Sequence, residues 1–86
     1  MIDFTTFILS IASAAFVGLG ITPDPTTTNT SIDLDMANHN IHLLEMLKEK
    51  TKNNLNYDEN KLIESLLYET RIRFLEVQKT ISTKKE

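Results

Sequence analysis

The first 20 residues contain a stretch that is apolar on almost every face of a helix. No charged residue occurs between Phe4 and Gly20. Asp3 can cap a helix at its start, and Gly18 and Gly20 can end it. We therefore predict a helix over residues 3–19. A helix of this kind must be buried by its own chain, by other copies or by lipid.

The next part of the chain is a linker followed by a second helix. Pro23 and Pro25 open the linker, predicted over residues 20–32, and a run of Thr, Asn and Ser follows. Over residues 33–52, apolar side chains recur at three- and four-residue intervals and predict an amphipathic helix. Its last turn carries three lysines that complement the helix dipole, and Asn53 can adopt the left-handed conformation that ends a helix.

A third helix is predicted over residues 57–82. It begins with a capping box, in which Asn56 is the N-cap and Glu59 follows three residues later. Its apolar positions alternate in spacings of four and three, which is typical of a helix that packs along a seam. Because only about four residues join it to the second helix, we expect an antiparallel αα-hairpin. The seam consists of Ile63, Leu67, Thr70, Phe74, Val77 and Ile81.

These elements predict an all-α protein, with three helices in a single domain over residues 1–86. A chain of 86 residues buries only about 60–65% of its unfolded surface. It has no cysteine, so it forms neither a disulfide nor a thiolate metal site. We therefore predict a homo-oligomer, a dimer or tetramer, built as a helical bundle. The predicted interface consists of Phe7, Ser10, Ile11, Ala14, Gly18, Ile63, Leu67, Phe74 and Val77.

Small residues recur every four positions in the first helix, at Ser10, Ala14 and Gly18. This spacing lets two helix backbones approach each other closely. We expect this face of small residues to pack against another helix. One option is the same helix of a symmetry-related copy.

A membrane span over residues 4–21 is the alternative. About 18 residues would cover roughly 27 Å, against a hydrocarbon core of about 30 Å. The nearest charges, Asp3 and Asp24, are acidic, whereas basic residues orient a span. A signal peptide is disfavoured because Met1-Ile2-Asp3 lacks a basic region. We therefore favour burial of this segment by protein over its insertion into a membrane. Hydroxyl side chains also lower the hydrophobicity of the segment: Thr5, Thr6, Ser10 and Ser13.

Few residues are arranged for chemistry. His39, His42 and Glu45 follow one another at three-residue intervals, and two histidines one turn apart can bind a metal when a third ligand converges. Glu45 is rotated away on the helix, so we interpret the three as partly exposed polar residues and predict no metal site. There is no cysteine nucleophile, serine elbow or glycine-rich phosphate loop, so no catalytic residue and no cofactor is predicted.

The net charge of –3 is unevenly distributed, because no Lys or Arg precedes Lys48. A nucleic-acid partner is therefore not expected, since the first half of the chain lacks a basic face. On the third helix, Glu69 and Arg73 are spaced for an ion pair one turn apart. Arg71 and Arg73 are interpreted as the solvated edges of the apolar seam, with interchain ion pairs as the alternative.

Several short motifs occur in the same order as in a known family. They are Phe4–Ser13 (FTTFILSIAS), Leu19-Gly20, Pro23-Asp-Pro25, Leu43–Lys52 (LLEMLKEKTK), Asn54-Leu55 and Leu66–Arg71 (LLYETR). Through them the chain resembles a bacterial family of small proteins catalogued as domain of unknown function 1844. It departs from that family at Asn53, where glycine is common, and in the Thr-rich linker. The resemblance implies a bacterial, cytoplasmic protein; it implies no activity and supplies no functional residues.

We expect a non-enzymatic assembly or adaptor protein that forms homo-oligomers and presents helical surfaces to an unidentified bacterial protein. The alternative is a subunit associated with the inner membrane through residues 4–21. A metal- or small-molecule-binding enzyme that uses His39 and His42 is the third and least supported hypothesis.

Overall fold

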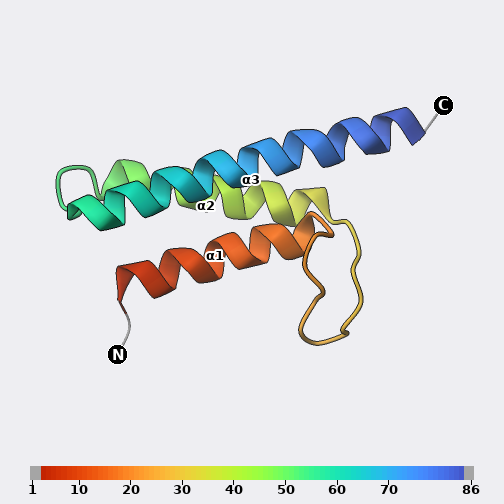
Figure 1. The fold of residues 1–86 in the computed structure, drawn as a ribbon, viewed down its shortest axis with the longest axis horizontal. Helices are drawn as coiled ribbons and strands as arrows, with labels where there is room; N and C mark the ends of the chain where they lie inside the picture. The colour runs from red at the N-terminus through yellow and green to blue at the C-terminus, as the bar shows by residue number, and fades with distance from the viewer. Residues whose placement is uncertain (1–2, 85–86) are drawn as a thin grey trace.

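Three helices make up the computed structural model, which describes the backbone of residues 3–84 and the side chains of residues 3–81. They are α1 (Phe4–Gly18), α2 (Leu34–Lys50) and α3 (Tyr57–Lys84). The part of the chain that the structure describes contains no strand, which confirms the all-α class. Consecutive helices run antiparallel and lie side by side, so α1 packs on the α2–α3 hairpin of its own chain (Figure 1).

Aspartate side chains cap the first two helices. The Asp3 carboxylate accepts a hydrogen bond of 2.7 Å from the backbone N–H of Thr6. Asp33 accepts one of 3.1 Å from Met36 at the start of α2. The backbone hydrogen bond from Thr6 holds the pKa of Asp3 below its ordinary value. Each cap satisfies a backbone donor that has no partner inside its helix.

The predicted capping box at the start of α3 is confirmed. The backbone N–H of Glu59 donates to Asn56 Oδ1 at 2.8 Å, and the N–H of Asn56 donates to Glu59 Oε1 at 3.0 Å. The preceding turn uses the predicted left-handed residue, because Asn53 has a φ of 70°. α2 ends at Lys50, two residues earlier than predicted, and α3 continues two residues further than predicted, to Lys84.

The core lies along the line where the three helices meet. Its residues are no more than 7% exposed. The first half of the α3 seam belongs to this core, and its one polar member, Thr70, is fully buried. The Thr70 hydroxyl donates to the backbone carbonyls of Leu66 and Leu67, so its burial leaves no unpaired donor. The core cluster comprises Ile8, Ile11, Ala12, Ala15, Ile41, Leu44, Ile63 and Leu67.

The end of α1 lies against the backbone at the start of α2. The N–H of Asp33 donates to the carbonyl oxygen of Gly18 at 2.7 Å. A Cβ atom placed on Gly18 would lie 2.8 Å from the nitrogen and 3.1 Å from the Cα of Ala37. These are backbone atoms that cannot swing away, so the close approach of the two helices requires glycine at position 18.

The linker between α1 and α2 folds into a hydrogen-bonded turn around Asp24. The Asp24 carboxylate accepts hydrogen bonds from the hydroxyl and the N–H of Thr26, and its carbonyl accepts from the N–H groups of Thr27 and Thr28. The side-chain hydrogen bond from Thr26 is the largest cause of a lowered pKa at Asp24. The linker therefore has a defined shape although Leu19, at its start, is its only fully buried large apolar residue.

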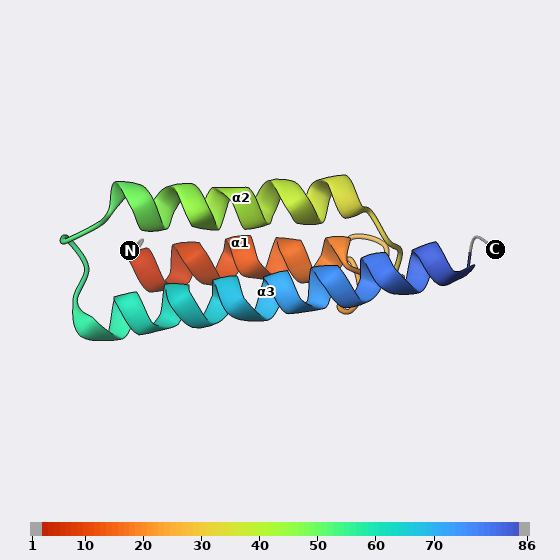
Figure 2. The ribbon, with the colours of Figure 1, turned by 90° about the horizontal axis from the view of Figure 1, so that it is seen from above.

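α3 is the longest helix, with 28 residues against 17 in α2. At 1.5 Å per residue it is about 42 Å long. Its C-terminal end extends past the end of the bundle at which α2 begins (Figure 2).

We predict that Gly18→Ala destabilises the fold by about 1–3 kcal/mol, because the new methyl group overpacks the contact with Ala37. Helix propensity alone predicts the opposite sign, since Ala is favoured over Gly within helices. Urea unfolding measures the difference. Ser65→Ala, on the exposed side of α3, is the control and should leave stability within about 0.5 kcal/mol. A Gly18→Ala protein as stable as the parent would contradict the close approach.

Asn56→Ala should cost about 1 kcal/mol of stability, because it removes the acceptor for the N–H of Glu59. Thermal unfolding followed by circular dichroism is a suitable measurement. Asn60→Ala is the matched control, four residues later on the same helix, and we expect it to change stability by less than about 0.5 kcal/mol. Equal losses in the two variants would show that the capping box contributes nothing specific.

Candidate interaction surfaces

One side of α1 is buried in the bundle and the other is exposed without a single charged side chain. Ile8, Ala12 and Ala15 are buried, whereas Phe7 and Leu9 are 46% and 43% exposed. The exposed side of a surface helix normally carries charged and polar residues. We call this exposed side the outer face of α1. It consists of Thr6, Phe7, Leu9, Ser10, Ser13, Ala14 and Val17.

A shallow groove lies at the C-terminal half of the outer face. α1 forms its floor, and the linker and the first turn of α2 form its walls, because the turn around Asp24 places Pro25 beside the helix. Its lining is mostly apolar or hydroxylic. We call it the α1–linker groove; it is lined by Ser10, Ser13, Ala14, Val17, Asp24, Pro25 and Met36.

The structure divides the nine residues predicted to form an oligomer interface into two groups. Four of them, Ile11, Gly18, Ile63 and Leu67, are buried inside the single chain. In particular, Gly18 makes its close contact with α2 of the same chain.

Five of the predicted interface residues keep accessible surface. Phe7 and Ser10 are exposed and Ala14 is partly exposed, all on the outer face of α1. Phe74 and Val77 are partly exposed on α3. Of the predicted interface residues, more therefore remain accessible on the outer face of α1 than on the seam of α3.

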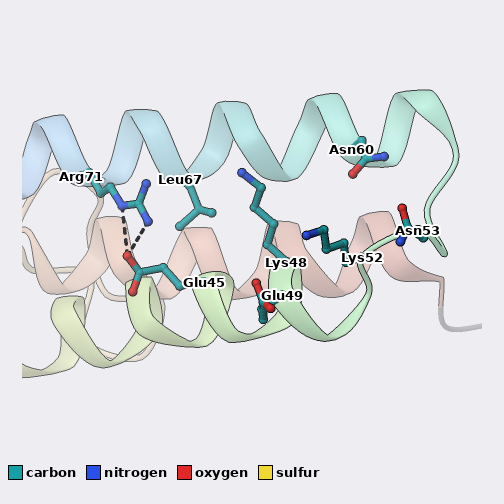
Figure 3. Close-up of a pocket in the computed structure, with 8 residues that line it drawn as sticks. All are labelled: Glu45, Lys48, Glu49, Lys52, Asn53, Asn60, Leu67 and Arg71. Carbon is teal, nitrogen blue, oxygen red and sulfur yellow. Dashed lines mark hydrogen bonds and ion pairs between the residues drawn. The ribbon is translucent and has the colours of Figure 1, made fainter.

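A second groove runs between α2 and α3, on the side of the hairpin that faces away from α1 (Figure 3). An ion pair between Arg71 and Glu45 crosses this groove. In this pair the Nε and Nη2 of Arg71 donate to Glu45 Oε2. On one side of this pair Lys48 points from α2 toward α3, Lys52 lies along the groove just after the end of α2, and Leu67 forms part of the floor.

On the other side of the pair is a more apolar hollow. It includes Ile41, Phe74 and Leu75, and Leu75 is 63% exposed. We call the two hollows together the α2–α3 groove. Tyr57 and Tyr68 are also largely exposed on α3, so the hairpin carries accessible apolar surface of its own.

Arg71 and Arg73 both pair within the chain. Arg71 pairs with Glu45 on α2, which lies 26 positions earlier in the chain. The spacing of residues within one helix could not predict this contact. Arg73 pairs with Glu76 at 3.3 Å, in place of the pair with Glu69 that the sequence spacing predicted. Both are near the surface, where ion pairs contribute little to stability.

The three residues considered for a metal do not form a ligand set. His42 Nε2 lies 4.0 Å from Glu45 Oε1, while the other oxygen of Glu45 accepts from Arg71. Among the residues that the structure describes, no group of three or more His, Cys, Asp or Glu side chains is placed to hold a metal ion.

α1 ends at Gly18, short of the proposed span over residues 4–21. Within residues 3–84, no helix is both long enough and apolar enough to cross a membrane.

A family model matches most of the chain. The model described as Domain of unknown function (DUF1844) matches residues 1–76, which confirms the resemblance indicated by the motifs. Searches of curated proteins and of solved structures gave no match.

We predict a weak coupling between Glu45 and Arg71, because both side chains are substantially exposed, at 39% and 51%. A double-mutant cycle with Glu45→Ala and Arg71→Ala should give a coupling energy below about 1 kcal/mol. Added salt should reduce it further. A coupling above about 2 kcal/mol that salt leaves unchanged would show instead that the pair is shielded from water.

Proposed function

The chain belongs to the family described as Domain of unknown function (DUF1844), and we propose that it acts without catalysis, as a homo-oligomeric assembly or adaptor protein. The observation that carries this proposal is the outer face of α1. Over the 15 residues of that helix no side chain is charged, although half of the helix surface faces away from the core.

The energetics of exposed apolar groups support self-association. Phe7 and Leu9 leave nearly half of their surface accessible in the single chain. Covering the rest of one such side chain contributes on the order of 1 kcal/mol, and a symmetric contact covers it once in each copy. The outer face itself has no charge, and the one ionisable residue beside it, Asp24 in the groove wall, already accepts two hydrogen bonds from Thr26. Association of two such faces therefore desolvates little charge.

The adaptor part of the proposal rests on the second surface. The α2–α3 groove lies on the opposite side of the hairpin from α1 (Figure 3). An assembly formed through α1 would therefore leave this groove open. We propose that it receives another bacterial protein in the cytoplasm, with Phe74 and Leu75 as apolar contacts on one side of the Arg71–Glu45 pair and the lysines of α2 on the other.

Native mass spectrometry and light scattering at low and high micromolar concentrations test the proposal. We expect the 9.8 kDa chain to give a dimer or tetramer without detergent, in a population that grows with concentration. A folded monomer at every concentration would contradict the proposal. Assembly only with detergent or lipid vesicles would also contradict it, and would support a membrane-associated subunit.

A further inference from the structure

Four side chains on the outer face of α1 follow the spacing of a coiled-coil seam. Phe7, Ser10, Ala14 and Val17 are separated by three, four and three residues, so they lie along one line of the helix. All four have accessible surface in the single chain. The stripe is bulky at its N-terminal end, at Phe7, and lies in the α1–linker groove at its C-terminal end.

We propose that this stripe pairs with the same stripe of a second copy, antiparallel and about a two-fold axis, so that Phe7 of each copy enters the α1–linker groove of the other. The inference rests on the proposed function and specifies its partner and contacts. In this register Phe7 meets Val17 of the second copy and Ser10 meets Ala14 of the second copy. Each groove is filled only when the second copy supplies its phenylalanine.

The sizes of the side chains favour the antiparallel arrangement. A parallel pair would place the two Phe7 rings against each other and leave both grooves empty. In the antiparallel pair the large ring faces the smaller residues of the groove, and Ser10 and Ala14 allow the two backbones to approach at the centre. The two helix dipoles then also oppose each other, which is the favourable orientation.

The polar atoms of the stripe are compatible with burial. The Ser10 hydroxyl already donates to the carbonyl oxygen of Phe7 at 2.6 Å, so it needs no donor or acceptor from the second copy. A charged partner is not favoured, because the stripe offers no charge to pair with. A second copy offers a stripe of the same uncharged chemistry and an aromatic ring for the groove. The one ionisable residue of that groove, Asp24, already accepts two hydrogen bonds from Thr26.

The length of α1 limits the strength of the contact. Fifteen residues make a helix of about 22 Å, and a pair of such helices buries less than the roughly 1,200–2,000 Å² of a standard interface. The dimer should therefore dissociate on dilution.

The chain has no cysteine, so introduced cysteines report the register without interference. The Ser10→Cys protein and the Ala14→Cys protein are mixed and allowed to exchange subunits. The mixture is then oxidised, and the disulfide-linked dimers are identified by their masses. We expect the disulfide between position 10 of one copy and position 14 of the other to dominate. Ser65→Cys, on the exposed side of α3, is the control and should cross-link no more than by random collision.

A cross-link pattern dominated by 10–10 and 14–14 products would overturn the inference, because it indicates a parallel pair. An oligomer whose α1 cysteines do not cross-link would also overturn it, while leaving the proposed function intact. A folded monomer would overturn both.

Phe7→Ala and Leu9→Ala provide a matched pair of variants, since the two side chains are almost equally exposed but only Phe7 lies on the stripe. We expect Phe7→Ala to raise the dimer dissociation constant at least about tenfold and Leu9→Ala to change it less than about threefold. Circular dichroism confirms that both variants fold. Ala14→Leu, which blocks the groove, should weaken the dimer as Phe7→Ala does. Equal effects of Phe7→Ala and Leu9→Ala, or a dimer unaffected by Ala14→Leu, would overturn the proposed register.

Discussion

The backbone contact between the end of α1 and the start of α2 determines how the rest of the protein is arranged. Gly18 lies so close to Ala37 that a methyl group would clash with the backbone, and its carbonyl oxygen accepts the N–H of Asp33. This contact fixes the C-terminal end of α1 against α2, and the core side chains Ile8, Ile11 and Ala15 continue the packing along the helix. One side of α1 thus completes the core, and the opposite, uncharged side must face outward.

That arrangement turns the apolar first helix into a helix with two packing surfaces. A chain of 86 residues has too little interior to bury such a helix on all sides. The inner side contacts α2 and α3 through Ile8, Ala12 and Ala15. The outer side retains Phe7 and Leu9 in a half-exposed state, and the ordered turn around Asp24 adds a wall beside it. We therefore regard self-association through α1 as the property that the fold supports best.

The features that the sequence predicted are those set by neighbouring residues. The three helices, the cap at Asp3, the capping box of Asn56 and Glu59 and the left-handed Asn53 all depend on contacts within about four residues. α2 ends two residues earlier than predicted because turn hydrogen bonds, such as that from the N–H of Lys52 to the carbonyl of Glu49, replace the helical ones and were not evident from the sequence.

Contacts between distant residues could not be derived in the same way. The spacing of Ser10, Ala14 and Gly18 indicates a close helix–helix approach but does not say which helix approaches, and at Gly18 it is α2 of the same chain. Arg71 meets Glu45 across the hairpin because the register of α2 and α3 brings them together. The α1–linker groove depends on a linker turn whose shape comes from hydrogen bonds to Asp24, and no apolar pattern signals such a turn.

Self-association through α1 is tested most directly by an isotope-filtered NOE measurement on a mixture of labelled and unlabelled protein. Within one α1 helix, Phe7 and Val17 are ten residues and therefore about 15 Å apart, too far for an NOE. We predict intermolecular NOEs from the Phe7 ring to the Val17 methyl groups of a second copy. Intermolecular NOEs confined to α2 and α3, or none at concentrations where light scattering shows an oligomer, would contradict it.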